Sequence, residues 1–174
     1  DAQDVLDYAL DSTKSGRVSF VRLILRERQR FTLDLIGYVK RHWVRDGTLA
    51  AFLDDDANLV SQPDDKGLTP LHIYVYHATI GNKSFSKKFR MFECIELLIV
   101  RGADLDAKTT SSITTDSGDY LFCGANHPVQ SGMTPMDIAR DCGVADRRPT
   151  VIAAVEAAIK KRDASVPRRG FLSI

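Results

Sequence analysis

The chain has 174 residues, with 24 lysines and arginines against 23 aspartates and glutamates, which gives a formal net charge of +1. This length is enough for one domain with a sizeable core or for a short repeat array. The nearly balanced charge argues against a protein that binds nucleic acid or a membrane surface through its net charge, although a local basic patch can still bind either.

Compartment signals in the sequence are few. No apolar run approaches the roughly 20 residues that span a bilayer, and no basic and then apolar signal segment opens the chain. The three cysteines, Cys94, Cys123 and Cys142, lack the even count and the spacing of a disulfide framework. We therefore expect reduced thiols and a cytoplasmic or nuclear location. Because the chain begins at Asp1 without methionine, we also expect it to be part of a longer protein.

Helical signals follow one another in the middle of the chain. Between residues 32 and 47, apolar side chains recur at helical spacing, at Leu33, Ile36, Val39 and Trp43. In "LTPLH", Thr69 supplies the hydroxyl of a helix N-cap, and Pro70 occupies the first helical position, where its missing N–H costs nothing. The apolar run over 94–100 predicts another helix, which Gly102 can close in the left-handed conformation.

The helix start recurs later in the chain. "GMTPMDIA", with Thr134 and Pro135, repeats the order Gly-x-Thr-Pro-apolar at a distance of about 65 residues, close to two repeat units of roughly 33. "DDKGLTPLH" together with "IELLIVRGADLDAK" resembles an ankyrin repeat, and "GMTPMDIARDCG" resembles the start of another. Leu71 and His72 match the first turn of the family's inner helix, and Asp137 stands where the last repeat would have that histidine.

The resemblance implies an all-α, ankyrin-type helical solenoid of about four stacked helix pairs with short β-hairpin fingers or loops. The pairs it implies, inner helix first, are 4–10 with 15–25, 32–47 with 47–53, a helix from Pro70 with 94–100, and 135–142 with 148–161. We expect a single domain over 1–165 and a tail over 166–174. The domain's parts are a degenerate N-terminal capping region (1–47), the best-matching repeats (48–107 and 132–162) and insertions (81–90 and 108–131).

Metal-binding patterns in the sequence are weak. His72 and His77 are five residues apart, which does not put them on one helix face as a zinc pair requires. Asp54, Asp56 and Asn58 imitate the opening of a calcium loop, but a leucine follows where the sharp turn needs glycine. We expect no metal site.

Catalytic patterns are equally weak. A Cys–His pair could be assembled from Cys123 and His127, but nothing in the sequence orients them, and both fall in a polar insertion. The glycine-rich phosphate and nucleophile motifs do not occur. We expect no enzyme, no cofactor and no small-molecule substrate.

The insertions are the sharpest clue to binding, because long loops on a rigid scaffold are functional or disordered. The first carries basic residues interleaved with aromatic ones, and the second carries aromatic residues in a Thr/Ser-rich stretch. In each insertion the aromatic residues either seal the loop to the stack or bind a partner. The residues concerned are Lys83, Phe85, Lys87, Lys88 and Phe89 in the first and Tyr120 and Phe122 in the second.

We expect a non-catalytic adaptor or scaffold module that binds another protein, as a monomeric domain. The resemblance implies a concave surface with Asp64, Asp65 and Lys66 at one hairpin tip and Tyr76 and His77 on the adjoining inner helix. One alternative is a regulatory or targeting domain of a larger enzyme, channel or secreted effector. The other is a binder of a phosphate ligand, an anionic lipid or a nucleic acid, through the basic loop 83–90, which predicts steep weakening with salt.

Overall fold

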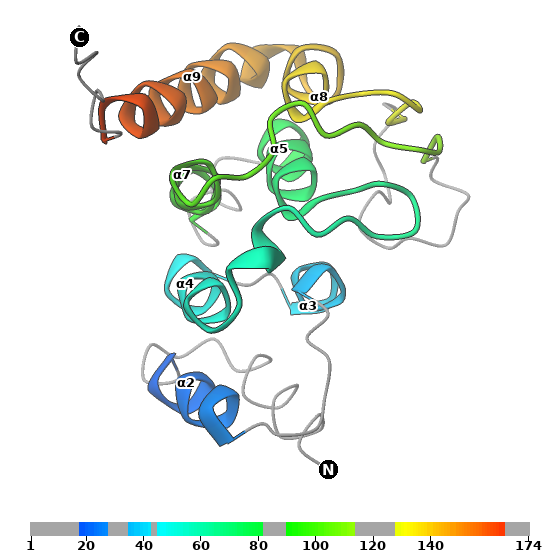
Figure 1. Ribbon diagram of the computed structural model, residues 1–174. Helices are drawn as coiled ribbons and strands as arrows, with labels where there is room; N and C mark the ends of the chain where they lie inside the picture. The colour runs from blue at the N-terminus through cyan, green and yellow to red at the C-terminus, as the bar shows by residue number, and fades with distance from the viewer. Residues whose placement is uncertain (1–17, 28–34, 43–44, 82–89, 114–127, 166–174) are drawn as a thin grey trace, which may run out of the picture.

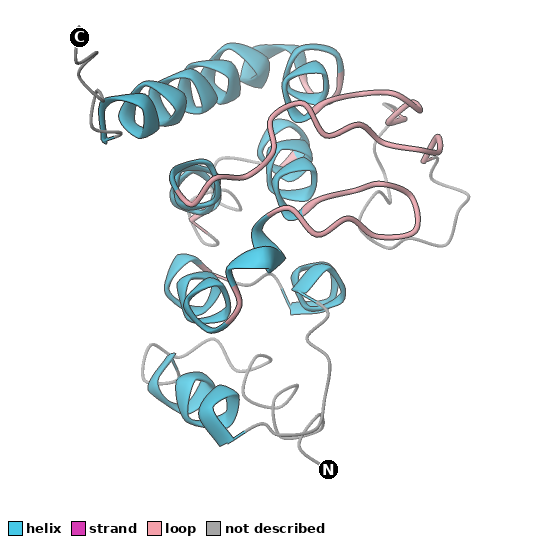
Figure 2. Cartoon of the chain, viewed as in Figure 1, coloured by secondary structure: helices cyan, strands magenta, loops and turns pink. Residues whose placement is uncertain are grey.

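The computed structural model describes residues 18–27, 35–42, 45–81, 90–113 and 128–165, and their regular structure is helical (Figures 1 and 2). The only β pairing among these residues is an isolated antiparallel bridge between Ile113 and Val129. The prediction of a helical protein is therefore confirmed. The α-helices are α2 (Val18–Glu27), α3 (Leu35–His42), α4 (Asp46–Asp55), α5 (Pro70–Ile80), α7 (Met91–Val100), α8 (Pro135–Asp141) and α9 (Arg148–Ser165), with short 3-10 helices η1 (Ala57–Val60) and η4 (Ala145–Arg147).

The helices lie in two columns (Figure 1). In one column α2 contacts α4, α4 contacts α7, and α7 contacts α9. In the other, α3 contacts α5, and α5 contacts α8. Contacts of α5 with α7 and of α8 with α9 join the columns, so the core lies between them.

Two helices begin as the sequence predicts. α5 starts at Pro70 after Thr69, and α8 starts at Pro135 after Thr134. At the second start the side chain of Thr134 accepts from the N–H of Asp137 at 3.2 Å, and a carboxylate oxygen of Asp137 accepts from the N–H of Thr134 at 2.9 Å. Both donors would otherwise lack a helical partner, so this reciprocal cap fixes the first turn.

Gly102 closes α7 in the way expected. Its φ is +90°, and its N–H donates to the carbonyl of Ile99 at 3.1 Å. The N–H of Ala103 donates to the carbonyl of Leu98 at 2.9 Å, which completes the two-bond pattern of a glycine-closed helix end. A side chain is disfavoured at this φ, which explains the glycine.

Several boundaries differ from the predicted ones. α7 begins at Met91 rather than at residue 94, and α9 continues to Ser165. The segment 32–47 does not form one continuous helix, because Arg45 is extended (φ −80°, ψ 163°) and α4 starts at Asp46. Periodicity locates helices better than it locates their ends, since apolar spacing continues across a short break. The predicted helix over 4–10 lies outside the described residues.

α5 is the central helix of the core. Every residue from Pro70 to Thr79 is buried, because α5 contacts α3, α7, α8 and α9. Tyr74 and Val75 stand where the family prefers alanine, yet both are accommodated with at most 1% of their surface exposed. The hydroxyl of Tyr74 interacts with the thiol of Cys94 on α7, and burial raises the pKa of both groups.

Candidate partner-binding surface

Three loop segments project from the same side of the two helical columns (Figure 1). They are residues 61–69, 103–113 and 128–134, which we call the finger surface. The first is the loop before α5, and the other two lead out of α7 and into α8. Function in a helical repeat is most often carried by such loops, because the stacked helices hold them in place.

Asp64 folds the first finger. One of its carboxylate oxygens accepts from the N–H of Lys66 at 2.9 Å and from the N–H of Leu68 at 2.8 Å. The N–H of Asp64 donates to the carbonyl of Leu68 at 2.9 Å. We had expected Asp64 to face a partner, but one of its oxygens is committed to the turn, as aspartate commonly is.

Gly67 brings the first finger against the second. Its φ is +75°, and a Cβ there would lie 2.7 Å from the nitrogen of Thr110 and 2.8 Å from the carbonyl oxygen of Lys108. The close approach lets the N–H of Thr110 donate to the carbonyl of Lys66 at 2.8 Å. The two fingers are therefore held side by side by backbone contacts.

Thr109 organises the base of the second insertion. Its N–H donates to the carbonyl of Met133 at 3.1 Å, and its carbonyl accepts from the N–H of Gly132 at 2.8 Å. Its hydroxyl donates to the carbonyl of Gln130 at 2.6 Å and accepts from the N–H of Met133 at 3.1 Å. The sequence analysis did not single out Thr109, because its partners lie more than 20 positions away.

The segments 103–113 and 128–134 remain paired beyond Thr109. The N–H of Ile113 donates to the carbonyl of Val129 at 2.8 Å, and the reverse bond is 3.2 Å long. Ser131 donates through its hydroxyl to the carbonyl of Thr110 at 3.0 Å. The insertion over 108–131 therefore leaves and re-enters the domain through a closed, hydrogen-bonded neck.

His72 connects the start of α5 to this neck. Its Nδ1 accepts from the N–H of Thr69 at 3.1 Å, so its Nε2 carries the hydrogen and donates to the carbonyl of Met133 at 3.2 Å. The ring is completely buried. Burial lowers the pKa of His72, and the carbonyl oxygens of Met133 and Ala107 offset part of that effect. The neutral ring of His72 therefore joins the start of α5 to the neck of the second insertion.

Two residues predicted to face a partner are buried. Tyr76 is 1% exposed and His77 is 3% exposed, because α5 is covered on all sides by its neighbours. Burial lowers the pKa of His77 to about 3 and raises the pKa of Tyr76. The expectation that these two side chains contribute to an accessible surface is therefore corrected.

The accessible part of the finger surface is polar and of mixed charge. Asp104 and Asp106 also hold the loop, since a carboxylate oxygen of Asp104 accepts from the N–H of Asp106 at 2.9 Å. Lys66 is half-buried. The exposed side chains include both charge signs and several hydroxyls, among them Asp65, Asp104, Asp106, Lys108, Thr110, Ser111, Gln130 and Ser131.

Seven predicted binding residues lie outside the described residues. They belong to the first insertion, between the end of α5 at Ile80 and Arg90, and to the second, between Ile113 and Pro128. The residues are Lys83, Phe85, Lys87, Lys88, Phe89, Tyr120 and Phe122.

The acidic residues at the end of α4 and just after it have structural partners. Asp54 pairs with Arg101 at 2.8 Å and with Arg22 at 3.1 Å, which links α2, α4 and the end of α7. The hydrogen bond from Arg101 lowers the pKa of Asp54, and Arg22 acts in the same direction. Asp56 accepts from the N–H of Asn58 at 3.0 Å and caps η1. Within the described residues, no group of three His, Cys, Asp or Glu side chains is arranged to hold a metal ion.

Two columns of helices with loops on one side are an arrangement found in helical repeat proteins. The model of the Ankyrin repeat family matches residues 66–110, which run from the end of the first finger through α5 and α7 into the second finger. The resemblance found in the sequence is thereby confirmed, and it indicates a protein–protein interaction module. Comparison with curated proteins finds no match, and comparison with solved structures finds none. Of the helices described, none is long and apolar enough to cross a membrane.

Proposed function

We propose that this chain is a non-catalytic interaction domain that binds another protein through its finger surface. The observation that carries the proposal is that the finger surface is both rigidly held and accessible. Gly67, Thr109 and His72 fix its backbone from below, while Asp65 and Lys108 at its edge are exposed. A preordered surface loses little conformational entropy on binding, so its contacts add to affinity.

The architecture that supports this role is a solenoid of four helix pairs within one domain over 1–165. α3 pairs with α4, α5 with α7, and α8 with α9, and α2 is the outer helix of a first pair whose inner helix would be 4–10. The contacts along each column favour this arrangement, because every outer helix described contacts the next. Repeats of this kind cannot bury a core alone, so they require their neighbours.

The two insertions enlarge the proposed surface. The closed neck formed by Ile113 and Val129 belongs to the finger surface, so the second insertion begins and ends within that surface. We propose that Tyr120 and Phe122 in that insertion supply aromatic contacts, because aromatic side chains dominate the energy of protein interfaces. The basic residues of the first insertion, Lys87 and Lys88 among them, would speed the encounter with an acidic partner.

The test is affinity capture with the intact chain followed by reconstitution with the purified partner. Two surface variants, Asp65→Lys and Lys108→Glu, should reduce capture and weaken the measured affinity about tenfold, which is the range of one lost charged contact. Asp163→Lys is the matched control, because Asp163 is exposed near the end of α9, outside the finger surface. If both finger variants bind as tightly as the control, the finger surface is not the site.

A further inference from the structure

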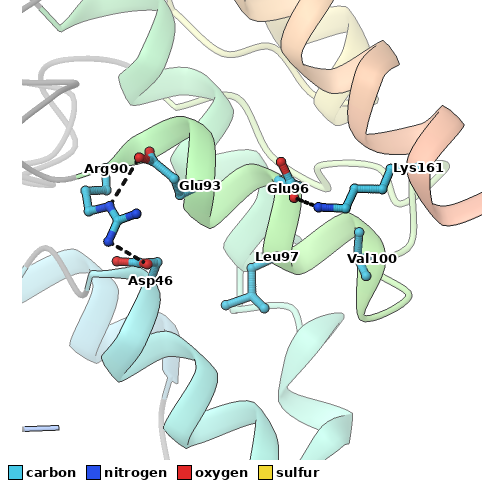
Figure 3. Close-up of a pocket in the computed structure, with 7 residues that line it drawn as sticks. All are labelled: Asp46, Arg90, Glu93, Glu96, Leu97, Val100 and Lys161. Atoms are coloured by element: carbon cyan, nitrogen blue, oxygen red, sulfur yellow. Dashed lines mark hydrogen bonds and ion pairs between the residues drawn. The ribbon is translucent and has the colours of Figure 1, made fainter.

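A cavity of about 330 Å³ opens on the column that contains α4, α7 and α9 (Figure 3). None of its lining residues belongs to the finger surface. It lies where α4, α7 and α9 meet, and α7 contacts both neighbours. Its lining comes from one residue of α4, one of α9, and Arg90 with the outward face of α7. The residues are Asp46, Arg90, Glu93, Glu96, Leu97, Val100 and Lys161.

Ion pairs fix the two ends of the cavity. At one end Arg90 pairs with Asp46 of α4 at 3.0 Å and with Glu93 of α7 at 3.1 Å. At the other end Lys161 of α9 pairs with Glu96 of α7. These exposed pairs add little stability, but they hold the charged side chains around the opening.

An aliphatic strip lies between the two ends. Leu97 is half-buried, and Val100 is 37% exposed, one of the few large apolar side chains among the described residues that remain accessible. They are three positions apart on α7, so they share the helix face that carries Glu93 and Glu96. The cavity therefore combines an apolar strip with charged ends, so it offers contacts for an aliphatic side chain and for a charged group.

The backbone at Arg90 is unusual. Its φ of 50° and ψ of 47° place it in the left-handed region, and within the described residues it is the only non-glycine residue with a positive φ. This conformation costs about 1 kcal/mol for an ordinary side chain. It directs the guanidinium of Arg90 between Asp46 and Glu93 (Figure 3).

The charge of the lining selects the kind of ligand. Three carboxylates, from Asp46, Glu93 and Glu96, face two cations, from Arg90 and Lys161, so one negative charge is not balanced within the cavity. We propose that this cavity is a second docking site, distinct from the finger surface, for a peptide segment of a partner protein that carries leucine or another aliphatic residue next to arginine or lysine. The aliphatic side chain packs on Leu97 and Val100, and the basic group pairs with the carboxylates.

The experiment uses nuclear magnetic resonance of the full chain with a defined probe, the short peptide Gly-Arg-Leu-Ala-Leu-Arg-Gly. Adding it should shift the backbone signals of α7 and of α9 around Lys161 in a saturable way. Two matched peptides, one with glutamate in place of both arginines and one with serine in place of both leucines, should bind about tenfold more weakly or not at all, because each loses one class of contact. Equal shifts with the glutamate peptide, or no saturable shift with the arginine peptide, would overturn the proposal.

Variants of the chain locate the peptide. Val100→Lys and Glu96→Lys should each weaken binding about tenfold. Their controls are Val144→Lys and Glu156→Lys, because these two residues are also exposed but do not line the cavity. A thermal melt of each variant excludes loss of folding, and if Val100→Lys does not fold, Glu96→Lys carries the test. Equal loss in variants and controls would show non-specific binding and reject the site.

Other occupants give distinct results that also reject the proposal. A second copy of the chain would shift the same signals on concentration alone, without peptide. The chain's own C-terminal segment carries Arg168 and Arg169 beside apolar residues. If replacing both arginines by glutamate in the full chain shifts the cavity signals without peptide, that segment is the occupant. Failure of the finger variants would not affect these results, so the two sites are tested separately.

Discussion

The Nε2 of His72 lies 3.2 Å from the carbonyl oxygen of Met133, which is 61 residues further along the chain. The same carbonyl accepts from the N–H of Thr109 at 3.1 Å. One buried imidazole thus connects the start of α5, through its bond to Thr69, with the neck of the second insertion. Because Nδ1 must accept from Thr69 in this arrangement, the ring has to be neutral.

The first prediction is that the domain loses stability in mild acid. His77 has a folded pKa of about 3, below the ordinary value of 6.5, and burial lowers the pKa of His72 in the same direction. Well above pH 6.5 both rings are neutral in both the folded and the unfolded state, so their protonation does not affect stability. As the pH falls below 6.5, the unfolded chain binds protons that the folded chain does not. For His77 alone, the free energy of unfolding then decreases by about 1.4 kcal/mol per pH unit.

Urea melts from about pH 7 to about pH 5, above the range where carboxylates titrate, check this slope. His77→Leu should make the dependence shallower, because it removes one of the buried rings. The exposed residue Lys160 offers a control, since Lys160→Gln leaves both histidines in place. A parent protein that is equally stable at both pH values would contradict the neutral, buried state of these histidines.

The second prediction concerns the caps of the two inner helices. Thr69→Ala and Thr134→Ala should each lower the free energy of unfolding by about 1 kcal/mol, the usual value of an N-cap side chain. Thr134 accepts from Asp137 and donates to it at 2.7 Å, so its loss also frees the carboxylate. The hydrogen bond from Thr134 lowers the pKa of Asp137, which should therefore rise in Thr134→Ala. Denaturant melts and titration of Asp137 by nuclear magnetic resonance measure the two effects, and melts that coincide with the parent would contradict the capping role.

The third prediction distinguishes two glycines with similar backbone angles. Gly67 and Gly102 have φ of +75° and +90°, so alanine is strained at both, at a cost of about 1 kcal/mol. A Cβ at Gly102 has nothing within 4 Å, whereas at Gly67 it would meet the backbone of Lys108 and Thr110 at under 3 Å. Gly67→Ala should therefore destabilise more than Gly102→Ala in urea melts. It should also increase amide exchange at Thr110, and equal effects of the two variants would show that the fingers do not stack closely.

How far the sequence predicts this structure depends on how local each interaction is. The caps at Thr69 and Thr134 and the closing Gly102 were predictable, because their partners lie within a few residues. The role of Thr109 was not, since it depends on Gln130 and Met133 on the far side of the second insertion. The partners of such residues depend on tertiary packing, which the local sequence pattern does not reveal.

The burial of Tyr76 and His77 has the same origin. The family resemblance implied that α5 is an inner helix and that Tyr76 and His77 lie on its part of the concave surface. The contacts of α5 with α3, α7, α8 and α9 leave both side chains buried. The outer cavity also had no sequence signal, because Asp46, Arg90 and Lys161 come from three separate segments. The only sequence feature of the cavity that lies within one segment is the spacing of Glu93, Leu97 and Val100, which puts them on one face of α7.

The last prediction concerns the first insertion, for which the sequence leaves two roles open, partner binding and sealing of the loop. Lys87→Glu combined with Lys88→Glu should slow association with an acidic partner, because opposite charge steers the encounter. Phe85→Ala or Phe89→Ala should speed dissociation while the melting temperature stays unchanged, because a buried aromatic residue holds a complex together. If these phenylalanines only seal the loop, the same variants melt earlier and the folded fraction binds as tightly as the parent. Melting and binding kinetics on the same four substitutions therefore separate the two roles, and unchanged affinity in all of them would leave the finger surface around Asp65 and Lys108 as the binding site.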